Sequence, residues 1–168
     1  MVIEAVAVGD EVIAPETDDA IFERLYPALR RFAAVTGPVE VEPDDLVQEA
    51  VARTLRSHRL CELDDPGAYL RRAIVHLAAN HRRSFARWRT AVVRLGRTDD
   101  SSVPEYSSDL ADLLRVAPET RAVLFMVAVE GRSYADAADV IGISEETART
   151  RAARARRRLR LDLEGEGS

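Results

Sequence analysis

The chain has 168 residues, a formal net charge of −5 at pH 7 and a hydrophobic fraction of 46%. This length allows one domain or two small ones, and the apolar fraction is sufficient for a folded core. The single cysteine, Cys61, excludes an internal disulfide and fits a reducing compartment. No stretch reaches the length of a membrane span and the first residues lack a secretory pattern, so we predict a cytoplasmic protein without membrane insertion.

Charge is distributed very unevenly along the chain. Residues 66–98 hold eight arginines and no acidic residue, and residues 147–160 hold seven arginines and no acidic residue. Residues 1–50, in contrast, hold twelve acidic residues and three arginines. Two separated basic segments suggest two contacts with one extended polyanion, a property that the net charge hides.

The N-terminal part is predicted to contain an acidic flexible tail and two helices. Residues 1–17 lack periodicity, whereas residues 18–34 carry apolar side chains at helical spacing. Pro43 fits the first position of the second helix, after a break at Thr36-Gly37-Pro38. The side chains predicted to face inward from this second helix are Leu46, Val47, Ala50, Val51, Thr54 and Leu55.

A third helix is predicted from Pro66 to about Leu95, with Asp65 as its cap. One stripe of it is apolar and contains Leu70, Ile74, Leu77, His81, Phe85, Trp88, Val92 and Leu95. A second stripe is cationic and polar and contains Arg72, His76, Asn80, Arg83, Arg87 and Arg94. The second stripe suits a phosphate backbone with exposed bases beside it. Phe85 and Trp88 could stack on such bases, but their spacing favours core packing, and the same position favours a core role for His81.

The C-terminal part follows a predicted flexible linker, residues 96–108, which is rich in Gly, Ser, Asp and Pro. Residues 109–163 are predicted to form a small domain whose buried centre is the apolar helix that Pro118 opens. Residues 131–160 then have the pattern of two helices around a tight turn. The residues predicted to set this turn are the cap Ser133 with Asp136, the left-handed Gly142 and the cap Ser144.

This last pattern is typical of a helix-turn-helix unit that places its second helix in the major groove of DNA. An ordinary helical hairpin with a solvated basic face is the alternative, and the seven arginines favour DNA binding. No strand pattern occurs, so we predict an all-α protein of two small helical domains joined by a flexible linker. We find no catalytic constellation, and His58 with Cys61 lacks a second pair at zinc spacing. We therefore predict no enzyme activity, no metal site and no cofactor.

In this order and at these separations, the motifs resemble the sigma factors of RNA polymerase, of the sigma-70 family and its small extracytoplasmic-function (ECF) group. The segment DDLVQEA, residues 44–50, resembles the part that docks on the clamp helices of the largest polymerase subunit. The resemblance implies core binding by Asp45, Gln48 and Glu49, and Arg53 joins them on the same outer face. A merely solvated helix face is the alternative.

Residues 66–83 resemble the helix that captures the melted minus-ten strand of a promoter, within a region 2-like domain over residues 18–95. The minus-ten contacts that this implies are Arg72, His76, Asn80, Arg83 and Arg87. Residues 131–159 resemble the part of region 4 that reads the minus-thirty-five duplex and sits on the flap of the second polymerase subunit. The minus-thirty-five contacts that this implies are Glu146, Thr147, Arg149, Thr150, Arg151, Arg154 and Arg158.

The resemblance implies a protein that directs polymerase core to specific promoters and assists melting, in contact with duplex and single-stranded promoter DNA. It leaves open whether an anti-sigma factor also binds. The alternative function is a self-sufficient helix-turn-helix repressor or activator with an N-terminal dimerisation or sensor domain, which would need only the C-terminal motif.

Overall fold

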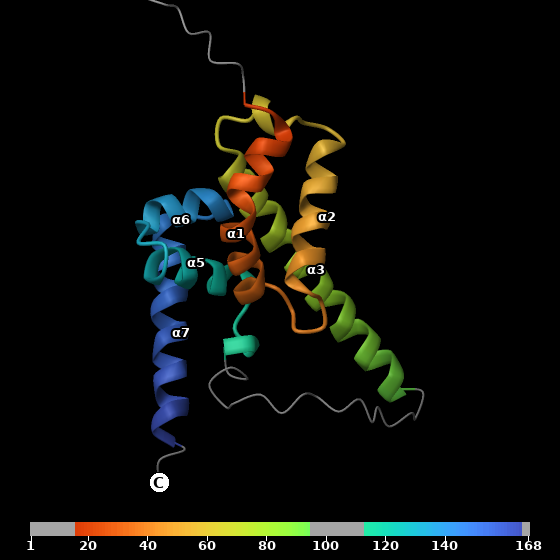
Figure 1. Cartoon of the computed structure of the whole chain (residues 1–168). Coiled ribbons are helices and arrows are strands. Elements are labelled where there is room, and N and C mark those ends of the chain that lie inside the picture. The colour runs from red at the N-terminus through yellow and green to blue at the C-terminus, as the bar shows by residue number, and fades with distance from the viewer. Residues whose placement is uncertain (1–15, 95–112, 166–168) are drawn as a thin grey trace, which may run out of the picture.

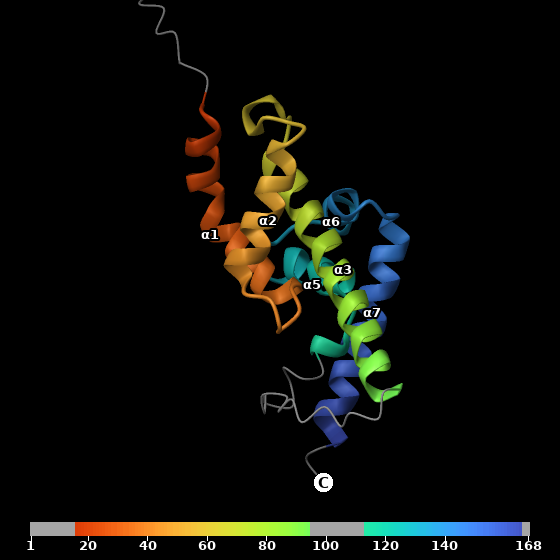
Figure 2. The same cartoon turned by 90° about the vertical axis from the view of Figure 1, so that its right-hand side faces the viewer.

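The computed structural model describes residues 16–94 and 113–165, apart from the side chains of Val92, Val93 and residues 160–165. The predicted linker and nearly all of the predicted tail lie outside these ranges. Within them every regular element is helical, which confirms the predicted all-α class. The chain is shown in Figure 1, and Figure 2 shows it turned by 90°.

The N-terminal half is a bundle of three α-helices with one short 3₁₀ helix between the second and the third (Figure 1). Its elements are α1 (Asp18–Thr36), α2 (Pro43–Leu55), η1 (Leu60–Glu62) and α3 (Pro66–Arg94). The caps explain these boundaries, because Thr17 Oγ1 accepts a hydrogen bond from the Ala20 N–H at 3.3 Å and Asp65 Oδ1 accepts one from the Ala68 N–H at 2.8 Å. Proline occupies the first position of both α2 and α3, as predicted.

The core of this bundle is aliphatic, with one aromatic ring. Its fully buried side chains include Leu29, Phe32, Leu46, Val47, Leu70 and Ile74. The prediction that Leu55 faces inward is wrong, because its side chain is 47% exposed. Thr54 takes the inward position in the last turn of α2, where its hydroxyl donates a hydrogen bond to the Ala50 carbonyl at 2.9 Å.

The C-terminal half consists of α5 (Pro118–Ala128), α6 (Tyr134–Ile141) and α7 (Glu145–Gly165). The predicted turn chemistry of the helix-turn-helix is confirmed. Ser133 and Asp136 form a capping box at the start of α6, and Gly142 ends that helix in the left-handed region with φ of 81°. Ala148 and Ala152 of α7 are fully buried, so this long helix lies close against α5 and α6.

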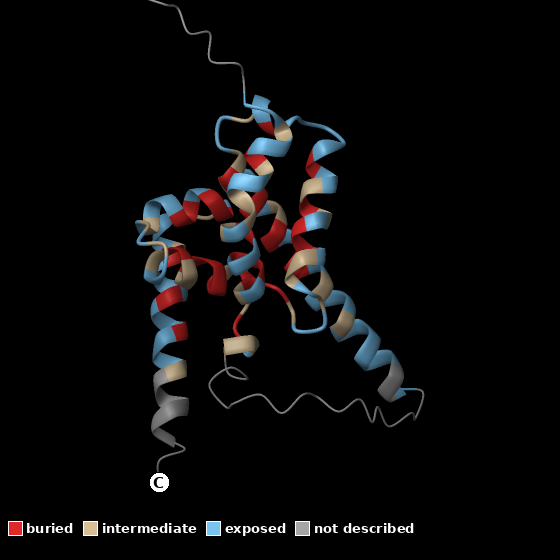
Figure 3. Ribbon diagram, viewed as in Figure 1, coloured by how far each residue is buried: buried red, intermediate tan, exposed pale blue. Residues whose placement is uncertain are grey.

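The two halves pack against one another. Helix α5 contacts α1 and α3, helix α6 contacts α3, and one continuous apolar cluster includes residues of both halves (Figures 1 and 2). Figure 3 shows buried residues on both sides of this junction. Nothing in the linear pattern predicted this contact between domains.

The C-terminal part of α3 leaves the bundle. Beyond Ala79 no described side chain of α3 is buried, and Figure 3 shows these turns largely exposed. The interpretation of Trp88 as a core residue is wrong, since its side chain is 54% exposed, and Phe85 is only half-buried. The reason is length, because α3 has 29 residues whereas α1 has 19 and α2 has 13.

Candidate nucleic-acid and polymerase interface

The outer face of α2 brings together the four residues predicted to bind polymerase core. Asp45 and Gln48 are exposed, and neither has a hydrogen-bond partner among the described residues. Glu49 is half-buried, and its carboxylate accepts hydrogen bonds from Arg53 Nη2 at 2.5 Å and from His81 Nε2 at 3.2 Å. Desolvation raises the pKa of Glu49, but the hydrogen bonds and charges of His81 and Arg53 outweigh it and hold the pKa below its ordinary value. Glu49 therefore also joins α2 to α3.

Asp44, in the first turn of α2, is a structural residue that the sequence did not single out. Its Oδ1 accepts hydrogen bonds from the Tyr26 hydroxyl at 2.6 Å and from Arg30 Nε at 2.8 Å. The hydrogen bond from Tyr26 has the largest effect on the pKa of Asp44, and together with Arg30 it lowers that pKa below its ordinary value. The two bonds fix the start of α2 against α1 and so orient the face that carries Asp45.

All five predicted minus-ten residues lie exposed along α3: Arg72, His76, Asn80, Arg83 and Arg87. Arg83 Nη2 donates to Asn80 Oδ1 at 2.5 Å and Arg87 Nη2 donates to Ser84 Oγ at 3.4 Å, so both guanidinium groups keep further donors for a ligand. These exposed donors and the acid-free stretch around them suit single-stranded DNA.

Arg72, the fifth predicted minus-ten residue, is bound to the other half of the chain. Its Nε donates a hydrogen bond to the Val140 carbonyl at 2.8 Å, and its Nη2 donates to the Asp139 carbonyl. Both carbonyls belong to α6, so in this structure Arg72 contributes to the contact between the halves.

Five of the seven predicted minus-thirty-five residues line one surface hollow on α7. They are Glu146, Thr147, Thr150, Arg151 and Arg154. The Ser144 cap positions this face, since its Oγ accepts a hydrogen bond from the Thr147 N–H at 3.2 Å. Arg149 points elsewhere, with its guanidinium 5.0 Å from the centre of the Tyr134 ring and its Nε bonded to Glu145 at 2.9 Å. Arg158 is exposed farther along the helix.

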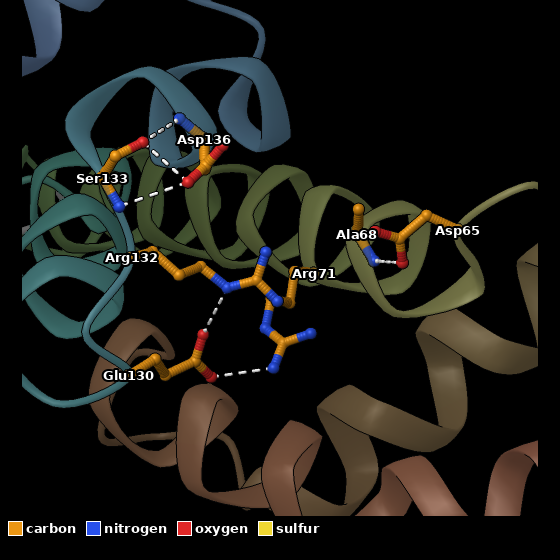
Figure 4. Close-up of polar contacts among 7 residues, drawn as sticks. All are labelled: Asp65, Ala68, Arg71, Glu130, Arg132, Ser133 and Asp136. Atoms are coloured by element: carbon orange, nitrogen blue, oxygen red, sulfur yellow. Dashed lines mark hydrogen bonds and ion pairs between the residues drawn. The ribbon is translucent and has the colours of Figure 1, made fainter.

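A buried ion-pair network joins the halves near the start of α6 (Figure 4). Arg71 Nη2 lies 2.8 Å from Glu130 Oε1, and Arg132 Nε lies 3.1 Å from Glu130 Oε2. The side chains of Arg71 and Glu130 are only 7% and 16% exposed. The sequence analysis assigned no role to Arg71 or Glu130.

A second buried cation, Arg121 of α5, contacts the end of α1. Its Nη2 donates a hydrogen bond to the Thr36 carbonyl at 2.9 Å, while Nε and Nη1 have no hydrogen-bond partner in the part of the chain that the structure describes. Burial, together with the nearby Arg82 charge, lowers the pKa of Arg121 to about 10, so the group stays charged at neutral pH. The sequence signal for this contact is a single arginine directly before the apolar run of residues 122–129.

Comparison with known proteins assigns the chain. Residues 21–89 match the Sigma-70 region 2 family, and residues 113–159 match the family described as Sigma-70, region 4. The two matched segments together cover more than half of the chain, in the predicted order. The chain belongs to the sigma-70 family.

Relatives of this chain are also described as sigma factors. The ECF RNA polymerase sigma factor SigM of Mycobacterium tuberculosis, in the strains Erdman and H37Rv, is 28% identical over 145 residues, which cover 84% of this chain and 74% of the relative. A solved structure of the sigma factor RpoE from Bartonella quintana, in complex with the anti-sigma factor NepR, has a similar fold. It gives a TM-score of 0.57 at 19% identity and covers 87% of this chain and 96% of the RpoE chain.

The assignment decides between the two functions that the sequence left open. This sigma factor, of the ECF group, directs RNA polymerase core to specific promoters, and the self-sufficient repressor or activator is not favoured. No helix among the described residues is long and apolar enough to span a membrane.

Proposed function

We propose that this sigma factor acts in the cytoplasm without chemistry of its own, through three surfaces that lie on three different helices. The outer face of α2 would dock on the clamp helices of the largest polymerase subunit. The polar stripe of α3 would hold the melted minus-ten strand, and the hollow on α7 would read the minus-thirty-five duplex while its domain rests on the flap. The observation that carries this division is that Asp45, Asn80 and Arg151 are all exposed, each on its own helix.

Mixing the purified full chain with polymerase core tests this proposal. A stoichiometric complex in size-exclusion chromatography supports it, whereas a free dimer that binds duplex promoter tightly would support the repressor or activator. An anti-sigma factor, the class of partner present in the RpoE structure, is a further proposed partner.

Trp88 is proposed as an additional contact for unpaired bases. The ring is exposed, no described ring or guanidinium stacks on it, and Arg87 and Arg89 flank it. Stacking of a base on an aromatic side chain contributes about 1–3 kcal/mol. Trp88→Ala is therefore expected to weaken binding of a single-stranded minus-ten oligonucleotide to the holoenzyme by about tenfold, and Trp88→Phe by less.

The fluorescence of Trp88 gives a direct second measurement, because it is the only tryptophan of the chain. A single-stranded oligonucleotide that stacks on the ring should quench this emission in the full chain. If the oligonucleotide binds without quenching and the affinity of Trp88→Ala is unchanged, then Trp88 does not contact the bases.

Arg151 and Arg157 are predicted to contact different parts of the DNA, a base and the phosphate backbone respectively. Arg151 lines the hollow near the start of α7. From there a long side chain would reach the edge of a base, and its planar fork could bond both acceptors of guanine. Arg157 is exposed farther along the helix, where we expect it to meet phosphate. Arg151→Ala should cost about 1–3 kcal/mol and relax the preference at one base pair of the minus-thirty-five element. Arg157→Ala should weaken all sequences alike and reduce the salt dependence.

Transcription from a promoter library randomised across the minus-thirty-five element, at two salt concentrations, checks this difference. Each variant serves as the control for the other, since both remove one exposed arginine from the same helix. If Arg151→Ala lowers transcription from all promoters alike, without a change in base preference, then Arg151 contacts phosphate and not a base.

A further inference from the structure

Tyr134, the first residue of α6, holds two arginines of α7. The centre of its ring lies 5.0 Å from the guanidinium carbon of Arg149 and 5.8 Å from that of Arg156. Its hydroxyl also accepts a hydrogen bond from Arg156 Nη2. A guanidinium within about 6 Å of the centre of an aromatic ring is attracted to the face of that ring. Tyr134 therefore orders both guanidinium groups at the junction of α6 and α7.

Arg149 and Arg156 lie on the same side of α7, because seven residues make almost two full helical turns. Both side chains are exposed, and neither lines the hollow that is proposed to read the minus-thirty-five duplex. Ala148 and Ala152 mark the buried side of the helix. The two arginines thus occupy the flank of α7 between the hollow and the buried side, which is the flank against which α6 packs.

This flank would face a DNA backbone when α7 lies in the major groove. A helix with its side chains is about 10–12 Å wide, and the groove is about 12 Å wide. Side chains on the flanks of the helix therefore meet the sugar-phosphate backbones that border the groove. The first helix of a helix-turn-helix crosses one of these backbones, and α6 is that helix here, lying across the start of α7 (Figure 1).

We infer that Arg149 and Arg156 form a phosphate clamp, a pair of guanidinium groups that binds the DNA backbone beside the minus-thirty-five element, and that Tyr134 is the positioning residue of this clamp. The inference rests on the proposed placement of α7 in the major groove. It adds a contact that reads no base, and it assigns a role to Tyr134 and Arg156.

Both guanidinium groups retain donors for phosphate oxygens. Arg149 uses Nε and Nη2 to bind Glu145. Among the described residues, Arg149 Nη1 and the Nε and Nη1 atoms of Arg156 have no hydrogen-bond partner. An arginine side chain loses rotamer freedom when it binds, and the ring has already restricted these two. Because Glu145 offsets part of the charge of Arg149, we expect Arg156 to contribute more to the clamp.

Arg149→Gln and Arg156→Gln test the clamp in the holoenzyme on duplex promoter DNA, at about 50 and 200 mM salt. Each lost phosphate contact lowers the salt slope by about 0.9, so the rise in salt should weaken each variant about 3.5-fold less than the parent. Base preference across the minus-thirty-five element should stay unchanged. The matched control is Arg31→Gln, which removes one exposed charge from α1 and should keep the salt dependence of the parent.

Tyr134→Leu distinguishes positioning from packing. It should weaken promoter binding about fivefold, because both cation–π contacts are lost. Tyr134→Phe keeps the ring and should stay within about twofold of the parent. When both arginines are already glutamine, Tyr134→Leu should have no further effect. A tyrosine that only packed α6 against α7 would weaken binding by the same factor in both backgrounds.

Unchanged salt slopes for both arginine variants would overturn the clamp, and equal losses from Tyr134→Leu in the two backgrounds would overturn the positioning role. Arg151→Ala, measured in the same assay, tests the proposed function separately. If Arg151→Ala changes base preference while the salt slopes of the arginine variants stay unchanged, α7 lies in the groove without a clamp. If Arg151→Ala leaves base preference unchanged, the placement of α7 itself is wrong.

Discussion

Replacement of both Asp45 and Gln48 by arginine is expected to abolish association with polymerase core while the fold stays intact. Both side chains are exposed on α2 and have no described partner, so the bundle loses no internal contact. At an interface, a change of charge sign can cost several kcal/mol, which corresponds to a loss of affinity of more than about 100-fold. Size-exclusion chromatography with core measures the association. Circular dichroism of the free chain measures whether the fold is intact.

The control carries the same total charge change on another helix. Ala20→Arg with Glu23→Arg alters two exposed residues of α1 and should leave core binding unchanged. Glu49 is a poorer target than Gln48, because its carboxylate bonds His81 and Arg53 and its loss would disturb the contact of α2 with α3. Retained core binding by the Asp45/Gln48 variant would remove the docking role from this face.

Ala152→Asp is expected to unfold the helix-turn-helix half. Ala152 is fully buried where α7 meets the other C-terminal helices, and an unpaired carboxylate at such a site costs more than about 4 kcal/mol. That cost is comparable to the whole stability of a small domain. Thermal unfolding followed by circular dichroism should show a large loss of helical signal or a much lower midpoint.

Ala153→Asp is the matched control, because it makes the same substitution one residue later at an exposed position. It should change stability by no more than about 0.7 kcal/mol, the difference in helix propensity. Similar unfolding curves for the two variants would mean that α7 does not bury the Ala152 side of the helix.

Local chemistry made much of this fold predictable. Prolines and polar caps mark where α2, α3 and α6 begin, and Gly142 marks the turn, because each satisfies a backbone requirement within a few residues. Errors occurred where an apolar residue kept the helical period but no neighbouring helix reached it, as for Trp88 and Leu55.

The contact between the halves could not be predicted in this way. A periodic pattern identifies which side of a helix is buried but not which helix covers it. From the sequence alone, Arg71 and Arg121 cannot be told from arginines that lie in solvent. Only their positions in space show that they are buried. Arg72 was assigned a DNA role, which remains a proposal, and its second set of partners lies 67 and 68 residues away in the chain.

The contact between the halves is intramolecular, and this determines what can regulate it. Two surfaces on one chain meet at an effective concentration that does not change on dilution and that is typically about millimolar for a short tether. The amount of this protein in the cell would therefore not alter the fraction of chains in which the halves are joined. A competitor must overcome that fixed local concentration, so control falls to the abundance and affinity of other molecules that bind one of the two faces.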